Sequence, residues 1–170
     1  YYQGGINFNP IINFDGSNHE LKSSIVANSV MTVFAITDGS NNSTKSLLHL
    51  DNGTNGSIEM KQLNSNTLEG RYTDSAGSSS GIVTNDITNV SSGIPYLVNY
   101  RHLENKKSRL FINGVLQSLP ASNTNANTLS GTMDANIGST PSDPTTRWQR
   151  DISELIIYDH KKSQSERQKI

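Results

Sequence analysis

Hydrophobic residues occur along the chain in short runs that alternate with clusters of Gly, Asn, Asp and Ser. In the segment 6–14 (INFNPIINF) the apolar residues recur at every second position, which is the period of a β-strand with one buried face. Pro10 within it favours an edge strand or a bulge. The segment 31–37 (MTVFAIT) is apolar on both faces, which predicts a central strand of a sandwich.

Two hairpins are predicted from Asn-Gly pairs between apolar runs. The runs 46–50 (SLLHL) and 57–63 (SIEMKQL) are joined by DNGTNG, and Asn113-Gly114 divides the run 109–119 (RLFINGVLQSL). Asn-Gly favours the positive φ angles of tight hairpin turns. Each pair of runs is therefore expected to form two neighbouring antiparallel strands.

Further strand-forming runs complete the expected fold. They are 70–74, 81–87, 94–103, 132–139 and 152–158. Together these segments predict about eleven or twelve short strands in an all-β, antiparallel two-sheet sandwich or jelly roll. No linker is long enough to divide the chain, so residues 1–170 are expected to form one domain.

The end of the chain predicts a strand followed by a short helix. Ser163 and Glu166 have the spacing of a capping box, in which both side chains satisfy amide donors of the first helical turn. We expect the helix to continue in a longer protein from which this segment comes. Strict alternation would place Glu154 on the face of Ile152 and Ile156, so a bulge or an ion pair with an arginine such as Arg101 or Arg109 is expected there.

Composition agrees with a loop-rich β protein, because 58 of the 170 residues are Ser, Thr or Asn. The formal net charge of −1 argues against nucleic acid as a partner, since that partner requires a clustered basic face. With no cysteine, disulfides and thiolate metal sites are excluded. No apolar run is long enough to insert into a bilayer. The sequence contains no signal peptide and starts with Tyr1, as expected of a segment from a longer precursor.

Three segments occur in a familiar order: INFDGSNHEL (12–21), RLFINGVLQS (109–118) and DISELIIYDHKKSQSERQKI (151–170). They resemble, in turn, the opening strand and turn, the Asn-Gly hairpin and the closing segment of concanavalin A-like, laminin-G-like jelly-roll domains. The sequence departs from the family at His19, where an acidic residue is common, and at Arg150, where Gly is common. The resemblance implies a short C-terminal helix and display in a large, secreted or surface protein of bacteria, beside flanking domains.

Catalysis is not predicted. Enzymes of this fold that cut polysaccharides resemble one another in a strand with closely spaced Glu and Asp residues, and no such run occurs here. The glutamates are scattered singly, and the four histidines lie far apart in sequence. Cleavage would need two distant carboxylates brought together in one groove.

Calcium is left open as a cofactor, and no other cofactor is expected. Asp51 and Asn55 lie around the tight turn DNGTNG, and hard cations favour such oxygen ligands. A plain hairpin explains the same glycines. The loops DGSNHE and SDPTTR also carry oxygen ligands.

The candidate ligand-binding residues are aromatic groups with polar neighbours in or beside loops. They are Trp148 with Arg147, and Tyr72 with Arg71 and Asp74. Sugars have apolar C–H faces that stack on aromatic rings, while polar side chains bind their hydroxyls. Packing in the core is the competing role for both rings, and the family resemblance places an aromatic residue before the closing strand.

The predicted function is that of a non-catalytic extracellular module that binds a glycan or a cell-surface polysaccharide, at the loops of one rim or on a concave sheet face. A mechanical spacer without a ligand is the main alternative, and polysaccharide cleavage is a third.

Overall fold

The computed structural model describes residues 11–28, 30–38, 44–51, 53, 56–64, 67–74, 79–83, 94–102, 108–117, 130–141 and 143–169. The segment 6–10, the turn residues around Asn55 and the charged segment 103–107 lie outside the described residues. The strands are β1 (Ile12–Asp15), β2 (Leu21–Asn28), β3 (Met31–Thr37), β4 (Lys45–Asp51), β5 (Gly56–Asn64), β6 (Thr67–Asp74), β7 (Ser79–Val83), β8 (Tyr96–His102), β9 (Ser108–Ile112), β10 (Val115–Leu116), β11 (Ser130–Ile137) and β12 (Gln149–Tyr158). The helical elements are the 3-10 turn η2 (Pro144–Thr146) and the helix α1 (Gln164–Arg167).

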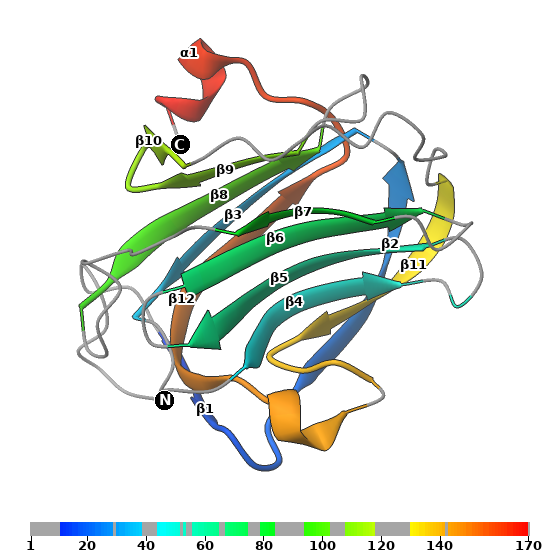
Figure 1. The fold of residues 1–170 in the computed structure, drawn as a ribbon, viewed down its shortest axis with the longest axis vertical. Coiled ribbons are helices and arrows are strands. Elements are labelled where there is room, and N and C mark those ends of the chain that lie inside the picture. The colour runs from blue at the N-terminus through cyan, green and yellow to red at the C-terminus, as the bar shows by residue number, and fades with distance from the viewer. Residues whose placement is uncertain are drawn as a thin grey trace.

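The strands form two six-stranded antiparallel sheets, as the alternation of apolar residues predicts. The first sheet has the order β1-β12-β3-β8-β9-β10, and the second has the order β2-β11-β4-β5-β6-β7. Figure 1 shows that β2 and β11 turn away from the direction of β5 and β6, so the second sheet is strongly twisted. The central position of β3, which is apolar on both faces, is confirmed.

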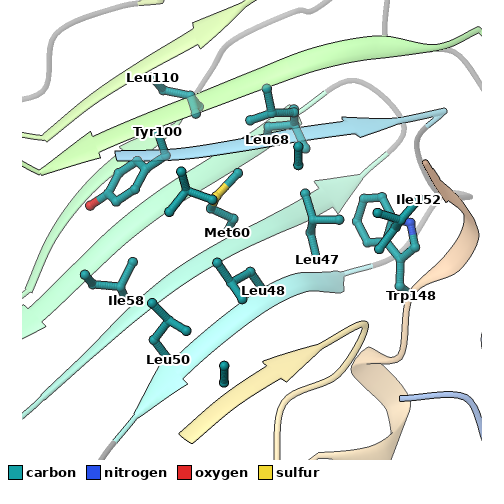
Figure 2. Close-up of a cluster of buried hydrophobic side chains, with 14 of the residues drawn as sticks. Leu47, Leu48, Leu50, Ile58, Met60, Leu68, Tyr100, Leu110, Trp148 and Ile152 are labelled. Carbon is teal, nitrogen blue, oxygen red and sulfur yellow. The ribbon is translucent and has the colours of Figure 1, made fainter. Parts of the chain in front are cut away.

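The core lies between the inner faces of the two sheets. Side chains at alternate positions of the strands meet there, and Figure 2 shows a row of them from Tyr100 and Met60 to Trp148 and Ile152. Gly70 of β6 lies against the Tyr100 ring, where a Cβ atom would come within 2.4 Å of Cδ2. Because Gly70 has no side chain, the Tyr100 ring can pack against β6 without a steric clash.

Both predicted hairpins are confirmed. β4 pairs with β5, with Asp51 opposite Ser57, and β9 pairs with β10 across Asn113-Gly114. Asn113 and Gly114 have φ angles of 49° and 80°, as a tight hairpin turn requires. Asn113 also accepts a hydrogen bond from the Leu97 amide through its side chain, at 2.9 Å, which ties the turn to β8.

The end of the chain follows the prediction at two points. The register of β12 against β3 shifts between Ile152 and Glu154, so a bulge brings the Glu154 side chain into solvent. The capping box is formed, because the Glu166 amide donates to Ser163 Oγ at 3.2 Å and the Ser163 amide donates to Glu166 Oε2 at 2.8 Å. Within the described ranges, no helix has the length and apolar character needed to cross a membrane.

Candidate functional site

The two aromatic residues predicted to contact a ligand lie in the core. Trp148 and Tyr72 each have 0% of their surface exposed. Tyr72 stacks on His102 of the opposite sheet, with ring centroids 3.7 Å apart. The expectation that these rings stand open at the rim is therefore corrected, because a ring without accessible surface offers no platform for a sugar.

Alternation along β6 and the chain's path before β12 explain this burial. Tyr72 follows Gly70 by two residues and so shares its inward face. The Trp148 amide donates to the Gly138 carbonyl at 2.8 Å, which holds the indole over the end of the sandwich. Figure 2 shows the ring beside Ile152 and Leu47. Core packing, the competing role, is the one that the structure gives both residues.

The polar residues predicted around these rings are separated by the fold. Asp74 is buried on the inner face of β6. Arg71 lies on the outer face, where it forms an ion pair with Glu69 at 2.7 Å. Arg147 lies beside β4 and donates to the Ser17 carbonyl through Nη1. These residues do not form one site.

The outer face of the second sheet carries a continuous set of charged side chains. Glu59 accepts from His49 at 3.0 Å and from Lys61 at 3.1 Å, and Lys61 also pairs with Glu69 at 3.2 Å. These contacts, with His49 foremost, lower the pKa of Glu59 to about 2. These side chains are only slightly exposed and contact one another, so they form a connected polar network on this face of the sheet.

A groove of about 540 Å³ lies on the same sheet, over β2, β11 and the end of β4. Asp51 and Asp134 are register partners on β4 and β11, and Ser24 is the partner of Asp134 on β2. Residues directly opposite each other on one face are close neighbours. The groove therefore has two carboxylates side by side, and it is lined by Lys22, Ser23, Ser24, Asp51, Gly53, Asp134, Ala135, Asn136 and Pro141.

Local hydrogen bonds hold the groove's charged groups in place. Asp51 Oδ1 accepts from the Gly53 amide at 2.7 Å, and Oδ2 lies 3.6 Å from His49 Nε2. Asp134 accepts from Ser24 Oγ at 3.3 Å. Lys22 Nζ lies 2.8 Å from Glu20 Oε1. The exposed edges of these groups can still accept from and donate to a ligand.

The structure bears only partly on the calcium residues predicted from the sequence. Asp51 is at the groove, whereas Asn55 lies outside the described residues. No cluster of three or more His, Asp or Glu side chains that could hold a metal ion occurs in the part of the chain described here. In the loop DGSNHE, Asp15 accepts hydrogen bonds from the amides of Ser17 and Asn18, which lowers the pKa of Asp15. In the loop SDPTTR, Asp143 accepts a hydrogen bond from the Thr145 amide. Both carboxylates thus stabilise turns.

Sequence reasoning missed the groove residues Lys22, Ser24, Asp134 and Asn136. Their period-two spacing within polar-apolar segments was the available signal, since it places Ser24 and Lys22 on one face of β2 and Asp134 and Asn136 on one face of β11. The pairing of β2 with β11 joins segments more than a hundred residues apart, and no local pattern specifies it.

The groove offers donors and acceptors but no aromatic platform among its lining residues. Carboxylate oxygens accept from paired hydroxyls, while the lysine ammonium donates to ring and hydroxyl oxygens. Such a surface suits a polar, hydroxyl-rich ligand bound by hydrogen bonds.

No protein-family model matches the chain, and a search of curated proteins finds no match either. Solved structures do resemble it. A heptameric SAP-like pentraxin from Limulus polyphemus has a TM-score of 0.72 at 16% identity, covering 90% of this chain and 77% of the pentraxin chain.

Two further structures extend the likeness. The CBM40 domain of Ruminococcus gnavus IT-sialidase, solved bound to α2,3 sialyllactose, has a TM-score of 0.64 at 15% identity, covering 92% of this chain and 95% of that domain. Domains LG4-5 of the mouse laminin α1 chain give 0.64 at 12% identity, covering 87% of this chain and 42% of theirs. These structural neighbours confirm that the chain has the concanavalin A-like, laminin-G-like jelly-roll fold.

Proposed function

We propose that this protein is a non-catalytic binding module of a secreted or surface protein, and that it recognises a glycan in the groove over β2, β11 and β4. The observation that carries the proposal is the groove itself, where Asp51 and Asp134 present acceptors and Lys22 presents a donor on one sheet face. A structural neighbour of nearly equal length, the CBM40 domain, was solved with a bound saccharide, which supports glycan as the ligand class.

Recognition rests on hydrogen bonds to sugar hydroxyls. Asp51 and Asp134 accept from two neighbouring hydroxyl groups, and this also relieves the repulsion between carboxylates that face each other across the strands. Lys22, whose side chain is 62% exposed, donates from the β2 side. Hydrogen bonds to charged groups contribute about 1.5–3 kcal/mol each, so two or three of them give measurable but modest affinity.

A glycan array with site and control variants tests this proposal. Asp134→Ala and Lys22→Ala are expected to weaken binding of the strongest array ligand about tenfold or more. Asp159→Ala and Lys161→Ala are matched controls, because they remove exposed side chains of the same kind after β12 on the other sheet. Equal binding by the site variants and wild type contradicts the groove assignment.

The same array, repeated in chelator, tests for calcium at the paired carboxylates. Signal that is lost in chelator and restored by calcium would assign Asp51 a metal-ligating role, as the turn DNGTNG suggested. Signal that persists in chelator supports hydrogen bonding by Asp51 and Asp134 alone.

Two alternative functions predict different results. A mechanical spacer gives no array signal under either condition. Polysaccharide cleavage also deserves a direct assay, since Asp51 and Asp134 place two carboxylates in one groove. Both accept hydrogen bonds, from the Gly53 amide and from Ser24 Oγ, whereas cleavage requires one of the two carboxyl groups to act as a proton donor. New reducing ends released from an array ligand would favour cleavage.

A further inference from the structure

Three arginines gather on the outer face of the first sheet, away from the groove proposed above. Arg101 of β8 and Arg109 of β9 are register partners, and Arg167 lies on α1, which folds back over this face. Figure 1 shows α1 beside β10 and β9. Like charges directly opposite on antiparallel strands repel each other, so this arginine cluster (Arg101, Arg109 and Arg167) needs a reason to form.

An aromatic ring lies at the centre of the cluster. The guanidinium carbon of Arg167 is 4.4 Å from the centroid of the Phe111 ring, and that of Arg101 is 5.9 Å from the same centroid. Phe111 follows Arg109 by two residues on β9 and so shares its face. Cation–π attraction to one ring offsets part of the repulsion between the guanidinium groups.

Among the side chains that the structure describes, no acidic group compensates the cluster. Within the described residues, none of the three arginines forms an ion pair, and the Nε atom of each is shielded from solvent without a hydrogen-bond partner. Arg167 Nη1 makes a long hydrogen bond of 3.4 Å to Asn99 Oδ1. Burial, together with the charges of Arg167 and Arg109, lowers the pKa of Arg101 to about 10.

The cluster borders a hollow of about 370 Å³ between the sheet and α1. Arg109 and Arg167 line it, and Asn99, Gln164 and Gln168 bring side-chain amides to the same space. Phe111 supplies an apolar surface. Guanidinium groups, amide donors and an apolar ring thus converge on a space large enough for a sugar-sized group.

We propose that the arginine cluster binds an oxyanion, either a carboxylate or a sulfate group, in this hollow. A guanidinium presents N–H donors in a planar fork that matches two oxygens of such a group. Partly buried cations without an ion-pair partner in the described structure are costly, and a bound anion reduces that cost for Arg109 and Arg167, which line the hollow. The same anion screens their repulsion with the neighbouring, buried Arg101. The amides and the Phe111 ring then contact the body that carries the charge.

This second site is independent of the groove, because it lies on the other sheet and takes a charged group instead of neutral hydroxyls. The oxyanion could be the carboxylate of an acidic saccharide or a sulfate. The choice of probes separates these two groups.

Isothermal titration calorimetry with sodium sulfate and with sodium glucuronate tests the proposal, at an ionic strength held constant with sodium chloride. Direct heats are needed because sulfate also stabilises folded proteins by exclusion from their surfaces. Glucose is the uncharged control for glucuronate. Arg109→Gln and Arg167→Gln are the site variants, and Arg71→Gln, on the outer face of the other sheet, is the matched control.

We expect saturable binding of at least one anion, weakened about tenfold or more in Arg109→Gln and in Arg167→Gln and unchanged in Arg71→Gln. Arg109→Lys should bind at an intermediate strength, since it keeps the charge and loses the fork. Tighter binding of glucuronate than of sulfate assigns the carboxylate of an acidic saccharide, and the reverse order assigns a sulfate.

Ligand-free stability provides a second readout. Because Arg109→Gln removes one of the mutually repelling charges, its melting midpoint should equal or exceed that of the wild type. Absence of saturable heat with both anions, or equal loss in Arg71→Gln, overturns the proposal. So does a lower midpoint in Arg109→Gln, which would mean that the arginine stabilises the fold as it stands.

Discussion

Replacement of Trp148 by Ala tests directly whether this side chain stabilises the core or contacts a ligand. The side chain is fully buried at the end of the sandwich, beside Ile152 and Leu47. Truncation of a buried Trp to Ala costs about 3–5 kcal/mol, because the transfer free energy is lost and a cavity remains. For a chain of this length, about 2–4 °C of melting midpoint corresponds to 1 kcal/mol, so the midpoint should fall by about 6–20 °C.

The assay is urea unfolding followed by far-ultraviolet circular dichroism, with glycan binding measured where the variant is folded. The urea midpoint should fall while the dependence on urea stays constant, which marks a change in stability alone. Trp148→Phe is the control. It keeps most of the apolar volume and removes an indole N–H that has no partner in the described structure, so it should lose less than half as much.

Two results would refute this reasoning. A Trp148→Ala protein with a wild-type urea midpoint would show that the indole does not pack in the core. A folded variant that has lost glycan binding, while Asp134→Ala retains it, would return Trp148 to the ligand site.

Three further predictions follow from the core and its neighbours. Gly70→Ala should destabilise the protein by about 1–3 kcal/mol in urea, because the new methyl group overlaps the buried Tyr100 ring, and an unchanged midpoint would mean that the ring moves freely. Burial lowers the pKa of His102 to about 4, so the unfolded chain binds a proton at higher pH than the folded one. The free energy of unfolding should therefore fall by up to about 3 kcal/mol as the pH drops from about 6.5 to about 4. Glu59 contributes to the loss of stability only below about pH 4.5. His102→Gln should abolish the loss between about pH 6.5 and about 4.5, and an equal loss in that variant would exclude His102 as its source. Fluorescence of Trp148, the one tryptophan in the chain, should be blue-shifted and resistant to iodide in the folded state, and red-shifted emission before urea is added would contradict its burial.

Local chemistry in the sequence was sufficient to predict most elements of the fold, although β2 (Leu21–Asn28) was not among the predicted strands. The Asn113-Gly114 hairpin, the central strand 31–37 and the capping box at Ser163 each depend on residues close together in the chain. The bulge at Glu154 could also be expected, since a charged residue on an apolar face requires either a change of register or an ion-pair partner. The structure shows the change of register.

The candidate site could not be predicted in the same way. Tyr72 and Trp148 lie beside polar loops in sequence, but burial depends on the sheet that covers them, and that sheet comes from distant segments. The pairing of Asp134 with Asp51 likewise depends on β11 lying between β2 and β4. Sequence proximity to loops was therefore a poor guide to exposure, because alternation within β6 decides which side chains face solvent.

The central claim is that glycan recognition depends on the groove over β2, β11 and β4. Amide chemical shifts of the isotope-labelled protein, titrated with its strongest array ligand, test it most directly. The proposal predicts shifts concentrated in residues 22–24, Asp51, Gly53 and 134–136, which are lost in Asp134→Ala and kept in Asp159→Ala. Shifts confined to the first sheet, or equal shifts in both variants, would contradict it.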